Sequence, residues 1–269
     1  MQLHRSNVLV TGASSGIGAA LAVVLAERGA TVGLVARRAE RLAAVLAECS
    51  PHTPESRAWP CDLGDVDAAC ALVGTVEHEW GAIDAIVHNA AIPKRVPVTA
   101  LSRAQLAETM RVNFDAPAAM TLAALPAMLA RGAGLIVNVS SVGGRAGGRN
   151  ESAYNSSKFA LAGWSEAMRI DLEGTGVAVK LVLPGPIESE IWDQPGNAPV
   201  LFEVEKVSAR DCAVGIADAM EDGGFEYYVP PVISGGLDVK QMIVDKTAHC
   251  DRYLAEMAAF TASLLPGAS

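Results

Sequence analysis

The chain has 269 residues, of which 51% are hydrophobic and 19% are charged, and its formal net charge is −9. Such a large hydrophobic fraction excludes a disordered chain, and the acidic balance argues against nucleic acid or an anionic membrane as the main partner. The charge is uneven, because residues 1–150 carry 13 basic and 12 acidic side chains whereas residues 151–269 carry 8 and 18.

Short apolar segments alternate with helical patterns along most of the chain. Strands are predicted over residues 7–11, 31–35, 57–61, 83–88, 135–140, 177–183 and 225–229. Helices are predicted over residues 19–28, 39–49, 65–80, 102–131, 153–174, 208–220 and 240–265, with a kink or break near Pro117. Because the strands lack polar alternation and are followed by helices, they predict a parallel sheet covered on both faces. We expect the α/β class and a single-domain Rossmann fold, a doubly wound parallel sheet of about seven strands.

Several features predict where the protein resides and what it does not bind. The polar N-terminal residues predict the start of a strand rather than a secretory signal. The most apolar long stretch, residues 116–130, is too short for a membrane span and fits a buried helix. Five cysteines without CxxC spacing are typical of reduced thiols, and five histidines show no metal-ligand spacing. We expect a cytoplasmic protein with no membrane span, no nucleic-acid partner and no metal site.

A glycine-rich loop follows the first predicted strand. Gly12 would permit a tight turn, Gly16 would let a pyrophosphate approach the backbone, and Gly18 would let the next helix pack closely. The N–H groups at the start of that helix can receive an anion. The loop is therefore predicted to bind a dinucleotide. Its cofactor-binding residues would be Gly12, Ser14, Ser15, Gly16, Ile17 and Gly18.

The tip of the second predicted strand indicates which dinucleotide binds. An acidic side chain there would bind the ribose hydroxyls of NAD, but the chain has Ala36 followed by Arg37 and Arg38. Guanidinium groups bind phosphate by charged, often bidentate hydrogen bonds. Arg37, with Arg38 beside it, is therefore predicted to hold a 2′-phosphate, so NADP(H) is favoured over NAD(H).

The spacing of the glycine loop resembles the TGxxxGxG loop of the short-chain dehydrogenase/reductase family. This resemblance extends from residue 7 to roughly residue 190 and implies further cofactor contacts. His88 and Ala91 depart from the family's NNAG signature, and Ser189 replaces a usual threonine. The implied contacts are Asp62 and Leu63 at the adenine, Asn89 and Ala90 after the fourth strand, and Pro184, Gly185, Ile187 and Ser189 at the nicotinamide.

A YxxxK motif begins the helix that follows the fifth strand. Tyr154 and Lys158 are four residues apart and so lie on one face of that helix. A nearby ammonium would lower the pKa of the phenol, which is ordinarily near 10, and make it a usable acid and base. Ser141 precedes Tyr154 by thirteen residues, and Asn113 lies on an earlier helix. Together these residues resemble the family's catalytic Asn-Ser-Tyr-Lys tetrad.

The resemblance implies an NADP(H)-dependent oxidoreductase. Ser141 would orient a substrate oxygen, Tyr154 would exchange a proton with it, Lys158 would tune Tyr154 and bind the nicotinamide ribose, and Asn113 would hold a water. The expected substrate is a small ketone, aldehyde or secondary alcohol of hydrophobic character. Two alternatives are a non-catalytic NADP(H)-binding redox sensor, which needs no tetrad, and a Rossmann-like methyltransferase, which would favour an acid where Arg37 stands.

The resemblance also divides the single domain, residues 1–269, into three parts. Residues 7–189 would form the cofactor-binding and catalytic core, and residues 190–207 a substrate lid. In the lid, Trp192, Val200 and Phe202 either line an apolar pocket or serve packing alone. Residues 208–269 would supply the C-terminal helices and the last strand. A homodimer or homotetramer is expected, although Tyr227–Pro231 departs from the glycine-rich ending of tetrameric members.

Overall fold

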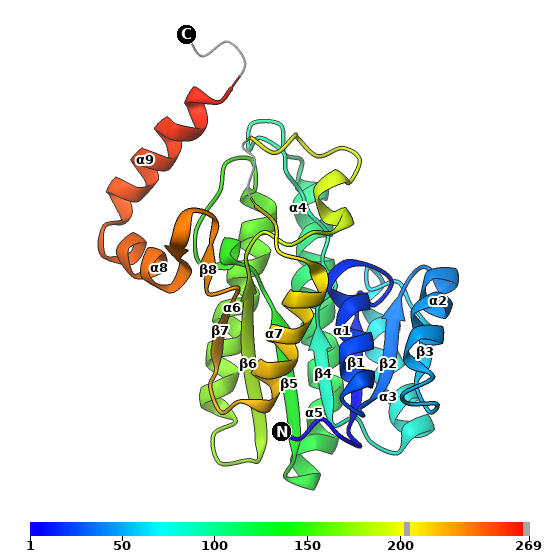
Figure 1. Cartoon of the computed structure of the whole chain (residues 1–269). Coiled ribbons are helices and arrows are strands. Elements are labelled where there is room, and N and C mark those ends of the chain that lie inside the picture. The colour runs from blue at the N-terminus through cyan, green and yellow to red at the C-terminus, as the bar shows by residue number, and fades with distance from the viewer. Residues whose placement is uncertain (202–204, 266–269) are drawn as a thin grey trace.

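The computed structural model describes residues 1–201 and 205–265, and its centre is a seven-stranded sheet (Figure 1). The strand order is β3-β2-β1-β4-β5-β6-β7, and every neighbouring pair is parallel. The predicted fold class is confirmed. The strands are β1 Asn7–Thr11, β2 Thr31–Ala36, β3 Arg57–Pro60, β4 Ala85–His88, β5 Gly134–Val139, β6 Val177–Pro184 and β7 Glu226–Val229.

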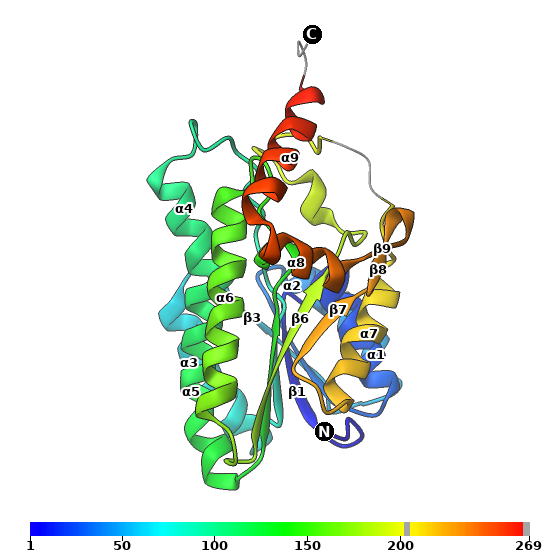
Figure 2. The same ribbon diagram turned by 90° about the vertical axis from the view of Figure 1, so that its left-hand side faces the viewer.

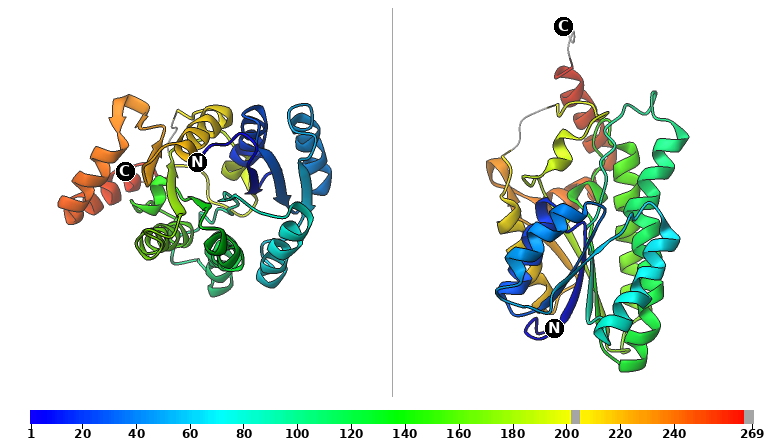
Figure 3. Two further views of the ribbon diagram at one scale, coloured as in Figure 1. Left: turned by 90° about the horizontal axis from the view of Figure 1, so that it is seen from below. Right: turned by 90° about the vertical axis from the view of Figure 1, so that its right-hand side faces the viewer.

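Helices cover both faces of the sheet, as the end-on and side views show (Figures 2 and 3). One layer holds α1, α2 and α7, and the other holds α3, α4, α5 and α6. All four side chains of β4 are buried, because the strand lies between the two layers. The helices are α1 Gly16–Glu27, α2 Ala39–Cys49, α3 Val66–Trp80, α4 Arg103–Met110, α5 Ala116–Arg131, α6 Ser152–Asp171, α7 Ala209–Glu221, α8 Val239–Ala248 and α9 Cys250–Ser263.

The strand order reverses between β1 and β4. In a doubly wound sheet, ligands bind at such a switch point, outside the carboxyl ends of the strands. The loops that follow β1, β4, β5 and β6 gather at this edge, which is the upper edge in Figure 1. The fold thereby brings the glycine loop and the YxxxK helix to the same edge.

The predicted kink near Pro117 takes the form of a π-helical turn, η1 Arg111–Asp115, between α4 and α5. Within this turn the Ala116 N–H donates to the carbonyl of Arg111, five residues earlier. Pro117 has no N–H to donate to the carbonyl of Asn113, so regular α-helical pairing cannot continue here. The helical stretch Arg103–Arg131 is long and apolar enough to cross a membrane by length and composition, but it packs against α3, α6 and β5.

Three predicted helices differ from the structure by three residues or by a break. The helix predicted over residues 153–174 ends at Asp171. The first helix begins at Gly16 rather than residue 19, so Gly16 and Gly18 lie in its first turn. The predicted helix over residues 240–265 is two helices, α8 and α9, that meet at His249 with φ −134° and ψ 51°. After the bend, α9 lies along the loop before α6, where Arg149 donates to Thr261 Oγ1 at 2.6 Å and to the Ala258 carbonyl at 3.0 Å.

The segment predicted as a lid leaves the sheet after β6 and returns before α7. A parallel bridge between Ile187, three residues before this segment, and Val207, its last residue, closes its base. Among the described residues between them lies one 3₁₀ turn, η3 Glu190–Asp193. Val200 is exposed, which does not fit a pocket-lining role, and Phe202 lies outside the described residues. A small hairpin, β8 Val232–Ile233 with β9 Leu237–Asp238, precedes α8 and was not predicted.

Candidate active site

The glycine loop requires glycine at three positions, two because of their backbone conformation and one because of close packing. Gly12 and Gly16 have φ of +70° and +54°, in the left-handed region that glycine adopts without strain. A Cβ on Gly18 would lie 2.3 Å from the Gly12 carbonyl oxygen, and a Cβ on Gly12 would lie 2.8 Å from Ala90 Cα. The loop is therefore pressed against the end of β4, and helix α1 begins directly from it.

Thr11 and Asn89 fix this loop to the fourth strand. Thr11 Oγ1 accepts from the N–H groups of Asn89 and Ala90 at 3.0 and 3.1 Å, and Asn89 Nδ2 donates to the Thr11 carbonyl at 3.0 Å. Asn89 thus joins the two sides of the switch point. The departure at His88 has a structural explanation, because its Nε2 lies 2.8 Å from Thr121 Oγ1 and burial lowers its pKa to about 3.

Arg38 reaches over the glycine loop. Its Nη2 donates to Ser14 Oγ at 3.0 Å and to Ser15 Oγ at 2.7 Å, and its Nη1 forms an ion pair with Glu190 at 2.9 Å. Arg37 is exposed beside it and lines the same cavity. Arg38 thus has hydrogen-bond and ion-pair partners at the glycine loop and in the lid segment, whereas Arg37, which the sequence analysis ranked first, is exposed.

Ser141, Tyr154 and Lys158 converge at the ends of β5 and α6. Ser141 begins the 3₁₀ turn η2 Val142–Gly144, and its Oγ accepts from Gly143 N at 3.0 Å. Tyr154 lies in the first turn of α6, one turn before Lys158. Lys158 is 2% exposed, and its Nζ donates to the Val139 carbonyl at 2.8 Å and lies 5.8 Å from the centroid of the Tyr154 ring.

The pKa values of this pair differ from the sequence-based expectation. Burial raises the pKa of Tyr154 to about 12; a hydrogen bond with Ser141 opposes this rise and the charge of Glu151 adds to it. Burial also lowers the pKa of Lys158 to about 7. The expected lowering of the phenol pKa by Lys158 is therefore not found, because desolvation outweighs any charge interaction and leaves Lys158 only partly protonated near neutral pH.

Asn113 is fully buried in η1, behind the other three tetrad residues. Its Oδ1 accepts from Ile92 N at 2.8 Å, and its Nδ2 donates to the Ile92 carbonyl at 3.1 Å and to Ser157 Oγ at 3.0 Å. Both amide hydrogens therefore have protein partners, and the amide oxygen has one. The side chain ties the loop after β4 to helix α6, so its N–H groups are not free to hold a water.

Two adjoining cavities contain nearly all of the predicted site residues. The larger, about 640 Å³, runs from the tip of β2 past the glycine loop. The smaller, about 160 Å³, lies over Ser141, Tyr154 and Lys158. Gly18 and Asn113 line neither cavity and lie behind the residues that do. The larger is lined by Gly12, Ser14, Ser15, Gly16, Ile17, Arg37, Arg38, Asp62, Leu63, Asn89, Ala90 and Ser189, and the smaller also by Pro184, Gly185 and Ile187.

Three further residues in these walls were not predicted from the sequence. Arg95 is 7% exposed, donates from Nε to the Ala198 carbonyl at 3.1 Å and lies 5.6 Å from the centroid of Trp192. Glu151 lies in the smaller cavity, where burial raises its pKa. Glu190 follows the predicted nicotinamide segment directly. No local pattern could have found these residues, because their partners are far away in the sequence.

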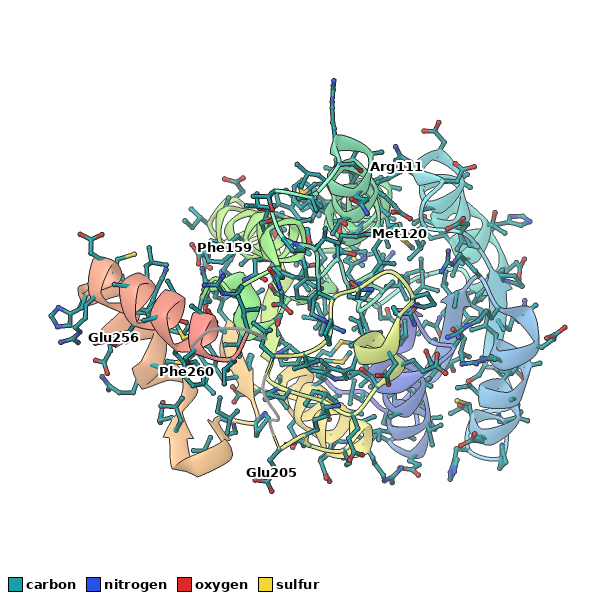
Figure 4. The ribbon with its side chains drawn as sticks, turned by 90° about the horizontal axis from the view of Figure 1, so that it is seen from above. Arg111, Met120, Phe159, Glu205, Glu256 and Phe260 are labelled. Atoms are coloured by element: carbon teal, nitrogen blue, oxygen red, sulfur yellow. The ribbon has the colours of Figure 1, made fainter. Side chains whose placement is uncertain are left out.

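The larger cavity also receives side chains from η1. Arg111, labelled in Figure 4, is one of its lining residues. In that view from above, the segment containing η3 lies beside the first two helices, in agreement with the contact between Glu190 and Arg38. The cleft is thus bounded by the glycine loop, by η1 and by the segment predicted as a lid.

Comparisons with known proteins agree on one family. A family model described as short chain dehydrogenase matches residues 6–198. A short chain dehydrogenase of Pseudocercospora fijiensis is 36% identical over 192 residues, which are 71% of this chain and 62% of that protein. This chain thus spans less than two thirds of that relative's length.

Solved structures of similar proteins give the same result. A metagenomic short-chain oxidoreductase in complex with NADP is 32% identical, with a TM-score of 0.72 over 84% of this chain and 97% of its own. A short-chain dehydrogenase from Sphingobium yanoikuyae in complex with NADPH is 26% identical, with a TM-score of 0.79 over 91% of this chain and 94% of its own.

Proposed function

This chain belongs to the short-chain dehydrogenase/reductase family, and we propose that it is an NADP(H)-dependent oxidoreductase acting on a ketone, an aldehyde or a secondary alcohol. The observation that carries the proposal is the convergence of Ser141, Tyr154 and Lys158 on one cavity that adjoins the glycine-loop cavity. A methyltransferase is no longer a candidate, because the family match excludes it.

The residues of the larger cavity fit a dinucleotide. The loop backbone comes close to Ala90 at Gly12 and to Ser189 at Gly16, and a side chain at either glycine would fill space that a pyrophosphate needs beside the loop. Arg38 offers guanidinium donors beside the loop serines, as a 2′-phosphate would require. That two similar structures hold NADP or NADPH supports the same cofactor here.

The chain's own groups would handle the substrate oxygen and its proton. A bound nicotinamide would supply or accept the hydride. The Ser141 hydroxyl would donate a hydrogen bond to the substrate oxygen, and the Tyr154 hydroxyl would give that oxygen its proton in reduction. Because burial raises the pKa of Tyr154 to about 12, the phenol is protonated at neutral pH, which is the form that carbonyl reduction needs. The protonated fraction of Lys158 would stabilise the phenolate that remains.

A substrate panel tests the activity most directly. The protein would be mixed with NADPH and a set of ketones and aldehydes, and with NADP and the corresponding alcohols, while absorbance of the reduced cofactor is followed. The panel should pair apolar with polar members, because Lys94, Arg95 and Glu151 line the catalytic cavity beside its apolar groups. Turnover of at least one carbonyl is expected. Cofactor binding without any turnover would instead support the redox sensor.

Arg38→Ala is expected to weaken NADPH binding by about 1–2 kcal/mol, roughly 5- to 30-fold, and NADH binding much less. The lower part of the usual range for charged hydrogen bonds applies because the Arg38 side chain is 42% exposed. Fluorescence titration with both cofactors measures the effect. Arg37→Ala is the matched variant and should cost less. Equal losses for NADPH and NADH in the Arg38 variant would contradict a phosphate role.

We also propose a location and an assembly state. All five cysteines are free thiols, two of them buried, which suits a reducing, cytoplasmic compartment. A homodimer or homotetramer is proposed from the family resemblance. Sedimentation of the purified chain would measure its oligomeric state.

A further inference from the structure

Glu190 places a carboxylate at the position where the proposed 2′-phosphate would bind. This residue begins η3, three residues beyond the bridge that closes the base of the lid segment. Its Oε2 lies 2.9 Å from Arg38 Nη1, and its Oε1 pairs with Arg41 Nη1. Both arginines belong to the segment after β2, so the pairing joins two parts of the chain about 150 residues apart.

The donors of Arg38 are shared among three partners. Nε and Nη2 face the hydroxyls of Ser14 and Ser15, and Nη1 faces Glu190. Carboxylate and phosphate oxygens bind the same guanidinium edges. An incoming phosphate would therefore either displace Glu190 or bring a second anion against the same cation. NAD(H) has no 2′-phosphate, so its binding requires neither displacement of Glu190 nor a second anion beside Arg38.

We propose that Glu190 is a specificity-determining residue whose carboxylate competes with the 2′-phosphate of NADP(H) for the Arg38 guanidinium. Specificity is a difference between two affinities, and a repulsive group acts on that difference as effectively as an attractive one. Arg38 favours the phosphorylated cofactor and Glu190 reduces that preference. The ratio of NADP(H) affinity to NAD(H) affinity is therefore smaller than it would be with the arginines alone. This inference rests on the proposed function, because it presupposes dinucleotide binding in the larger cavity.

Glu190→Gln tests the competition with cofactor binding as the readout. Glutamine keeps the size and the acceptor oxygen of the side chain and removes its charge. NADPH and NADH dissociation constants would be measured by fluorescence titration of the full chain at one fixed salt concentration. NADPH should bind about three- to tenfold more tightly and NADH should change by less than about twofold, because exposed ion pairs are worth little each.

Asp193→Asn is the matched control, since it removes an equal charge from an exposed position on the same turn. Its NADPH affinity should change far less than that of Glu190→Gln. Equal gains in the two variants would overturn the inference, as would an unchanged or weaker NADPH affinity in Glu190→Gln. If the unmodified protein binds neither cofactor, the proposed function itself fails. If it binds both and the ratio is unaffected by the substitution, only the role of Glu190 fails.

Discussion

Replacing Tyr154 with phenylalanine is expected to reduce turnover about 10²- to 10⁴-fold and to leave NADPH binding nearly unchanged. The substitution removes one hydroxyl and keeps the ring, so the packing at the start of α6 should persist. The lost group is the proton donor, which the Ser141 hydroxyl cannot replace, because an aliphatic alcohol is a much weaker acid than a phenol. Single-turnover rates with a carbonyl substrate and NADPH measure the chemical step apart from binding.

Tyr253→Phe is the control for the chemical change itself. Tyr253 is a half-buried tyrosine on α9, remote in sequence from the tetrad, and burial raises its pKa as well. Loss of its hydroxyl should alter the rate by less than about twofold. If Tyr154→Phe retained a near-normal rate, the proton would have to come from another group, and Glu151 in the same cavity would be the first to examine.

The parts of the site that could be predicted from the sequence are those whose signal is local. Gly12, Gly16 and Gly18 lie within a span of seven residues, and Tyr154 and Lys158 are four residues apart, so each group lies on one short piece of backbone. The parallel sheet was predictable for a similar reason, because burial on both faces leaves a continuous apolar run in a strand such as β4.

What could not be predicted depends on contacts between distant segments. Glu190 meets Arg38 across 152 positions, and Arg95 meets the carbonyl of Ala198 across 103. The bend at His249 carries no glycine or proline, and contacts of Arg149 with α9 accompany it. The pKa of Tyr154 could not be predicted either. The YxxxK motif shows that a lysine is near, but not how deeply the phenol is buried, and burial has the larger effect on its pKa.

Lys158 is expected to affect both turnover and the pH dependence of stability, and replacing it should produce the second large effect. The folded protein holds this amine with a pKa of about 7, lowered by burial from 10.5. Between these two values the unfolded chain binds more protons than the folded one, so the free energy of unfolding should rise with pH. The destabilising contribution is fully present below pH 7 and is lost as the pH rises toward 10.5. The slope within the window approaches about 1.4 kcal/mol per pH unit.

Lys158→Met should therefore abolish that slope while reducing turnover at least about 100-fold. Denaturant unfolding of both proteins at pH 7.0 to 8.5, about the range in which other groups titrate least, measures the slope. Taking the difference between the two proteins cancels contributions from the buried thiols of Cys49 and Cys212, whose pKa values burial raises. Methionine leaves the Val139 carbonyl without its donor, which costs about 1 kcal/mol at every pH and does not alter the slope. Identical slopes would show that the amine is solvated in the folded protein. Normal turnover with the slope lost would show that Lys158 is buried there without serving the reaction.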